Sequence, residues 1–167
     1  MIWIDIVISL VLIFSFIGGL KEGAVKSFFS LLGLFICIPL TGLTYPYLFN
    51  LLAAISDATW RGFISFLVTF VIISIILALI FLIPGKLLSA TWNKGVLNMI
   101  LGGCFSLVGA AISITIFSIV VQAYPVFDWL DYAVTHSNVI NWLMNYLGFI
   151  KLMLPQTFHS LAMSVRF

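Results

Sequence analysis

Charged side chains are scarce in this sequence: 7% of its residues are Asp, Glu, Lys or Arg, whereas 63% are hydrophobic. An ordinary soluble domain carries about 25% charged residues, which keep its surface hydrated. Seven basic and five acidic residues cannot cover the water-facing surface of a 167-residue chain. We therefore expect much of the surface to face lipid. The net charge of +2, without a basic stripe, also argues against nucleic acid as a partner.

Residues suited to catalysis or metal binding are equally few. Cys37 and Cys104 lie inside apolar runs without zinc-type spacing, so we expect buried free thiols. His136 and His159 have no acid at catalytic spacing and are expected at the surface. The sequence shows no paired carboxylates, no Ser-His-Asp set and no phosphate-binding glycine loop. It predicts no enzymatic activity, no cofactor and no metal.

Four long uncharged stretches predict membrane-spanning helices, because about 20 apolar residues cross a hydrocarbon core of about 30 Å. The expected spans cover about residues 2–20, 28–49, 62–83 and 97–122. Pro39 is expected to weaken or kink the second span, which should end irregularly around Tyr45-Pro46-Tyr47. Pro84-Gly85 is expected to end the third span. A signal peptide is disfavoured, because no basic residue precedes the first stretch and no small-x-small cleavage site precedes Lys21.

The sequence changes character after the fourth span. A polar face at helical spacing is formed by Asn138, Asn141, Asn145 and Gly148. Apolar residues recur on the opposite side, so we expect an amphipathic helix lying in the membrane surface. A helix packed on the spans from outside the bilayer is the alternative, and a fifth span would bury three asparagines. The predicted fold is all-α and polytopic, with a four-helix transmembrane domain at 1–124 and an amphipathic interfacial tail at 125–167.

Basic residues in the short loops predict the orientation. Lys21 and Lys26 follow the first span, and Lys86 and Lys94 follow the third. Only Arg61 lies between the second and third spans. Cytoplasmic loops carry the excess of Lys and Arg, so both termini are expected outside the cytoplasm.

Small residues occupy one face of the fourth span. Gly102, Ser106, Gly109 and Ser113 are spaced four, three and four residues apart. Lipid gives helices no hydrophobic reason to associate, so close approach through small residues is a main route. We expect this face either to pack against another span of the same chain or to bind a partner, such as a second copy.

A charged, glycine-containing turn follows the first span. It contains Gly19, Lys21, Glu22, Gly23 and Lys26. Glu22 and Lys26 are four residues apart and can pair on a helix. The turn is interpreted either as a solvated loop or as a docking site for a cytoplasmic partner.

Asp5 is the only acid within a predicted span, and it lies near the end of that span. It is expected either to interact with the positive end of its own helix, worth about 0.3–1 kcal/mol, or to contact an ion or partner. The second, third and fourth spans contain no Asp, Glu, Lys, Arg or His. Ion-coupled carriers usually keep such a group in the membrane.

Three stretches resemble the bacterial CvpA family, the colicin V production proteins. They are the opening Met-Ile-Trp-Ile-Asp at 1–5, the turn at 18–26 and the glycine-containing stretch at 97–109. With the four-span order, the resemblance covers roughly residues 1–122. The family has an Asp-Arg pair where this sequence has Asn98 and Met99. Its second glycine falls at Ser106 and a further arginine at Val108.

The resemblance implies a bacterial inner-membrane protein linked to colicin V production or export, or to envelope maintenance. We expect a non-enzymatic protein that acts through helix–helix contacts with itself or with an unidentified membrane or export partner. The alternative is a small oligomeric channel or transporter, with the prolines of the second span beside a pore. Its candidate lining residues are Ser65, Thr69, Ser74, Ser113, Thr115 and Ser118.

Overall fold

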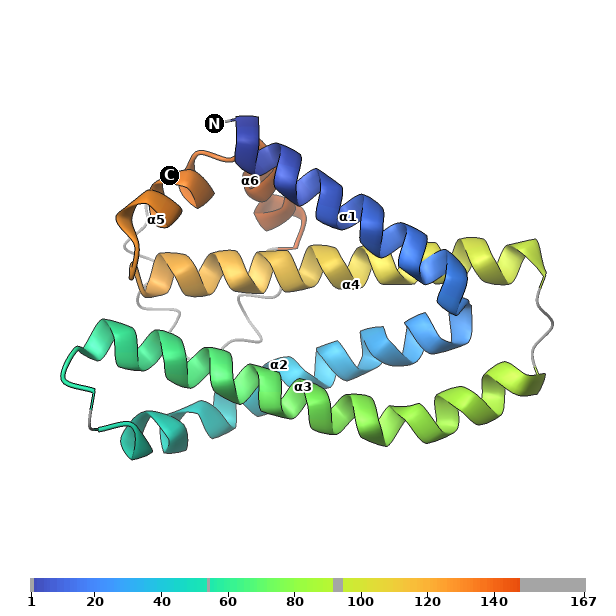
Figure 1. Ribbon diagram of the computed structural model, residues 1–167, viewed down its shortest axis with the longest axis horizontal. Coiled ribbons are helices and arrows are strands. Elements are labelled where there is room, and N and C mark those ends of the chain that lie inside the picture. The colour runs from blue at the N-terminus through green and yellow to red at the C-terminus, as the bar shows by residue number, and fades with distance from the viewer. Residues whose placement is uncertain (1, 54, 92–94, 148–167) are drawn as a thin grey trace.

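The computed structural model describes residues 2–53, 55–91 and 95–147, and these are helical with short connections (Figure 1). The six helices are α1 (Ile2–Glu22), α2 (Ala24–Leu51), α3 (Ala58–Thr91), α4 (Val96–Ala123), α5 (Asp128–Thr135) and α6 (Asn138–Tyr146). No strand occurs within the described ranges. The predicted all-α class is confirmed.

Four of the helices are long and apolar enough to cross a membrane. The spans have mean hydropathies of 2.3, 1.9, 3.0 and 2.4, and cover Trp3–Glu22, Ala24–Leu51, Ala58–Phe81 and Val96–Ala123. Large apolar side chains such as Phe14 and Leu43 are exposed, which suits contact with lipid. The prediction of a polytopic membrane protein with four spans is confirmed.

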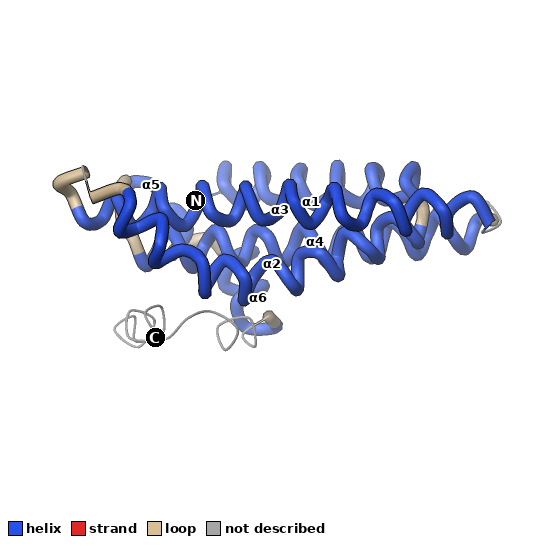
Figure 2. The backbone as a smooth tube through the Cα atoms, turned by 90° about the horizontal axis from the view of Figure 1, so that it is seen from below, coloured by secondary structure: helices blue, strands red, loops and turns tan. Residues whose placement is uncertain are grey.

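The long helices form two pairs that run along the long axis of the molecule (Figure 2). α1 packs mainly on α4 and α2 mainly on α3, while α2 also contacts α4 and joins the pairs. α5 and α6 lie at the end of the bundle where α4 finishes (Figure 1). We call the half of the bundle that contains α5 and α6 the α6 half. The opposite half contains the α1–α2 turn, and we call it the Gly23 half.

The turn between α1 and α2 is a single residue, Gly23. Its φ of +82° lies in the left-handed region, which glycine adopts without strain. The Gly23 N–H donates to the Gly19 carbonyl at 3.0 Å. Because α2 begins at Ala24, the residues predicted to form a loop after the first span belong to the ends of two helices.

The prolines do not end the helices that contain them. α2 continues through Pro39 and Pro46 to Leu51, so the prediction of an irregular end around Tyr45-Pro46-Tyr47 is wrong. α3 continues past Pro84-Gly85 to Thr91, so the prediction that these residues end the third helix is wrong. A proline removes one backbone hydrogen bond, and neighbouring turns of a membrane helix can remain hydrogen-bonded around that gap.

The tail contains two short helices, α5 and α6, where one was expected. The chain restarts at Ser137, whose hydroxyl accepts a bond from the Ile140 N–H at 3.2 Å and caps α6. Ile140 and Leu143 on α6 are buried, and α6 contacts α4 and α1. These contacts support the alternative of a helix packed on the spans. Positions 148–167 of the predicted tail lie outside the described residues.

The main hydrophobic core lies in the α6 half. It brings together large side chains from the five helices α2 to α6, including Ile38, Phe66, Ile112, Val134 and Ile140. Ile112 and Val120 are each 1% exposed. The interior of the Gly23 half contains a cavity instead.

Candidate functional site

A cavity of about 730 Å³ lies between the helix pairs in the Gly23 half. All four long helices contribute to its wall. The wall contains apolar residues such as Leu34, Leu77 and Phe105, together with many hydroxyls. The serines that line the cavity are Ser15, Ser27, Ser30, Ser74, Ser106 and Ser113. Its volume lies within the range of about 300–1,000 Å³ that is typical of small-molecule sites.

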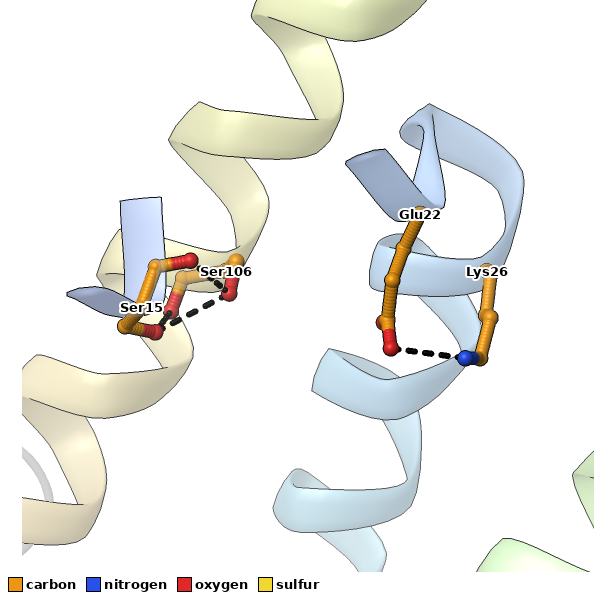
Figure 3. Close-up of polar contacts among 4 residues, drawn as sticks. All are labelled: Ser15, Glu22, Lys26 and Ser106. Carbon is orange, nitrogen blue, oxygen red and sulfur yellow. Dashed lines mark hydrogen bonds and ion pairs between the residues drawn. The ribbon is translucent and has the colours of Figure 1, made fainter. Parts of the chain in front are cut away.

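An ion pair lies at the exposed end of this cavity, and Figure 3 shows its two residues, Glu22 and Lys26. Lys26 Nζ donates to Glu22 Oε1 at 2.6 Å, and the two side chains are 60% and 46% exposed. Both residues line the cavity. An exposed pair of this kind is worth about 0–1 kcal/mol, so it contributes little stability. Its exposure marks one opening of the cavity, and Ser30 and Ala78, which also line the cavity, are exposed as well.

Two serines join α1 to α4 beside the cavity (Figure 3). Ser15 Oγ donates to the Ser106 carbonyl at 3.0 Å, and Ser106 Oγ donates to the Ser15 carbonyl at 2.8 Å. The two hydroxyl oxygens are 2.9 Å apart. Hydrogen bonds between membrane helices average about 0.6 kcal/mol, and here several act at one place. Ser106 therefore helps to hold α1 on α4.

The small-residue face of α4 packs within the same chain. A methyl group on Gly102 would overlap the Gly19 carbonyl oxygen, and one on Gly19 would overlap the Gly102 carbonyl oxygen. Gly109 is less crowded, because a methyl there would lie 3.7 Å from Leu31. Ser113 lines the cavity and donates to the Gly109 carbonyl at 2.9 Å. Of the two interpretations of this face, these contacts match packing against other spans of the chain.

Asp5 links the start of α1 to the start of α6. Its Oδ1 accepts a short hydrogen bond from Ser137 Oγ and a longer one, 3.4 Å, from the Val139 N–H. Ser137 is fully buried. Asp5 and Ser137 are 132 positions apart, so sequence periodicity contains no signal for this contact.

Two fully buried serine hydroxyls, Ser27 Oγ and Ser65 Oγ, have no hydrogen-bond partner among the described residues. Ser27 is 2% exposed and lines the cavity, whereas Ser65 is 0% exposed and does not. A buried hydroxyl without a partner destabilises a protein by about 1–3 kcal/mol. The cavity offers Ser27 space for a polar molecule.

The two cysteines are free, as predicted, but the prediction that both are buried is wrong for Cys104. Cys37 Sγ lies 3.3 Å from Ser74 Oγ on the cavity wall, and Cys104 is exposed. No group of three or more His, Cys, Asp or Glu side chains suited to a metal occurs among the described residues.

The family relationship now adds to this geometry. The family model described as colicin V production protein matches residues 4–148, which is most of the chain. The chain belongs to the colicin V production protein family. Comparison with curated proteins and with solved structures gives no significant match.

In this colicin V production family member, Asn98 stands where the resemblance places an aspartate. Its Oδ1 accepts a hydrogen bond from the Ala24 N–H at 2.8 Å. Asn98 therefore satisfies one of the free N–H groups at the start of α2, which an aspartate would also do. Met99 and Val108 are exposed, at the positions of the two arginines. Asn98 therefore makes this capping hydrogen bond without a charge.

In the charged turn of this family member, the glycines are buried in a helix contact and the charged residues are exposed. Gly19 and Gly23 are buried at the contact with α4. Lys21 is exposed, as are Glu22 and Lys26 in their ion pair.

The predicted pore-lining set is partly placed on the cavity. Ser74 and Ser113 line it, but the other four residues do not. Thr69 donates to the Ser65 carbonyl, and Thr115 donates to the Ala111 carbonyl, within buried helix contacts. Ser118 donates to the Ile114 carbonyl. The prediction omitted the serines of α1 and the start of α2, although Ser27 and Ser30 lie three residues apart on one helical face.

Proposed function

We propose that this protein is a non-enzymatic inner-membrane protein that assists toxin production or export, or envelope maintenance, through contacts with itself or a partner protein. The observation that carries the proposal is the family match over residues 4–148 on a chain with four membrane spans. The family description supports the process, and the four spans support the location.

Partner contacts need a surface that the chain does not itself cover. On the small-residue face of α4, Gly102 is covered by α1 and the start of α2, and the other three residues border the internal cavity, so this face is a poor candidate. Phe14 on α1 and Leu79 on α3 are 69% and 62% exposed and point away from the bundle. We propose that a partner or second copy approaches these lipid-facing helices.

The test combines a functional measurement with photo-cross-linking in cells that secrete a colicin V-type toxin. Deletion of the protein should reduce the toxin activity released into the medium. A photoreactive residue at Phe14 or Leu79 should form a defined cross-link. The same residue at Ile112, which is 1% exposed, is the buried control and should form none. Unchanged toxin release together with no cross-link at either exposed position would contradict the proposal.

The predicted orientation belongs to this proposal, because it decides which end of the cavity meets the cytoplasm. With both termini outside, the Glu22–Lys26 ion pair and the cavity entrance lie on the cytoplasmic side. A C-terminal reporter that works only in the cytoplasm should be inactive. The same reporter inserted at Gly95, which is exposed, should be active.

The cavity favours a second candidate function, a small oligomeric channel or transporter. It extends from the exposed ion pair to Cys37, which lies well inside α2. Irregular or polar interiors are tolerated in a membrane where they line water. Reconstituted vesicles that show no flux of ions or small solutes above protein-free vesicles would exclude this candidate.

A further inference from the structure

We propose that the cavity of the Gly23 half is a water-accessible binding site for a small uncharged molecule bearing hydroxyl or amide groups. Ser27 is one of the groups that bind it. The site is entered at the Glu22–Lys26 ion pair. It requires neither toxin export nor passage across the membrane, so it goes beyond both functions proposed above.

The buried hydroxyl of Ser27 is the first observation. It is 98% removed from solvent by the protein, lies on the cavity wall and has no partner among the described residues. A buried polar group is normally hydrogen-bonded to protein or to ordered water. The cavity has room for on the order of 20 waters at about 30 Å³ each, or for a small organic molecule with a few waters.

The chemistry of the wall determines the class of ligand. Serine hydroxyls donate and accept hydrogen bonds, which suits the hydroxyl or amide groups of a ligand. The charges on the wall, Glu22 and Lys26, neutralise each other in their own ion pair. A charged ligand would therefore lose hydration without finding a free opposite charge among the described lining residues. The wall accordingly favours an uncharged polar molecule.

The cavity ends within the bundle. Beyond Cys37 and Ser113 lie Ile38 and Ile116, which are 2% and 3% exposed and belong to the main core. This apolar core separates the cavity from the α6 half. A polar molecule that enters at Glu22 and Lys26 would therefore be held at the closed end and would need a further opening to pass through.

Ser65 provides a matched control, because its hydroxyl is equally buried and equally without a partner but does not line the cavity. The experiment uses the full chain in lipid vesicles, with Cys37→Ser and Cys104→Ser as background. Single cysteines are introduced as Ser27→Cys or Ser65→Cys. Their rates of modification by hydroxyethyl methanethiosulfonate, a small neutral polar reagent, are compared with that of a chain that keeps only the exposed Cys104.

The cysteine at position 27 should react at least about tenfold faster than the one at 65, because the latter reacts only when the core opens locally. Glycerol, used as the probe ligand, should slow modification at 27 and leave Cys104 unchanged. Three results would overturn the proposal. They are equal rates at 27 and 65, equal slowing of Cys104 by glycerol, or modification at 27 only by an apolar maleimide, which would indicate that a lipid chain fills the cavity.

Discussion

The two halves of the bundle are built from the same four helices but are held together differently. The α6 half is filled by large aliphatic and aromatic side chains, and α6 covers it. The Gly23 half is held by close backbone contact at Gly19 and Gly102 and by paired serines. Close backbone approach joins α1 to α4, but it does not fill the space between the helix pairs. Small residues can therefore tighten one helix contact and leave a cavity beside it.

The largest expected effect is at the glycine contact. Gly102→Leu should prevent α1 from packing on α4, because any side chain there overlaps the Gly19 carbonyl. Ordinary overpacking destabilises by about 1–3 kcal/mol, and a leucine that overlaps backbone atoms of two helices should exceed that range and separate α1 from α4. Gly109→Ala is the control, because its methyl would meet Leu31 at an ordinary 3.7 Å. Thermal unfolding in detergent should separate the two. Similar stability for both variants would show that the glycine contact does not hold the Gly23 half together.

The next effect compares truncations in the two halves. Ile112→Ala in the main core should destabilise by about 2–5 kcal/mol, because it opens a void among buried side chains. Leu77→Ala should have a smaller effect, because Leu77 already borders the cavity. The measurement is the free energy of unfolding in detergent or bicelles. If Leu77→Ala destabilises as much as Ile112→Ala, the two halves are packed alike.

A smaller effect, an increase in stability, is expected when one of the two buried serine hydroxyls is removed. Ser65→Ala should stabilise the fold by about 1–3 kcal/mol, because it removes a buried hydroxyl without a partner. Ser27→Ala should be nearly neutral, because the proposed site places a water molecule on that hydroxyl. Unfolding measurements on both variants decide this. Equal stabilisation by the two changes would indicate that the cavity is dry.

The smallest effect concerns the pH dependence of the α6 half. Burial, and secondarily the nearby Asp128, raise the pKa of Asp131 above its ordinary value of 3.8. The folded state then holds this proton more tightly than the unfolded state. Its contribution is complete at a pH below 3.8 and is lost as the pH rises through the folded pKa.

Asp131→Asn should therefore remove part of the fall in stability between acid and neutral pH. Asp128→Asn should remove less, because burial is the larger cause of the shift. The midpoint of thermal unfolding, measured from pH 3 to 7, tests both variants. A steeper fall in the Asp131→Asn variant would contradict the assignment.

Local composition was sufficient to predict the spans. The scarcity of charge and the four apolar stretches predict four membrane helices, since helix formation in lipid depends mainly on length and hydrophobicity. The effect of proline was less predictable. Pro84-Gly85 was expected to end the third helix, but α3 continues to Thr91. One lost hydrogen bond does not decide where a long membrane helix ends.

The sequence by itself determined that this chain resides in a membrane, and it pointed to the small residues of α4 as a contact face. The tertiary structure alone decided what they contact, because Gly102 meets Gly19 across 83 positions. It also decided that Asn98 caps α2, that Asp5 meets Ser137, and that Ser27 borders a cavity whereas Ser65 does not. Hydropathy is a property of neighbouring residues, whereas close contacts and cavities depend on which helix faces meet.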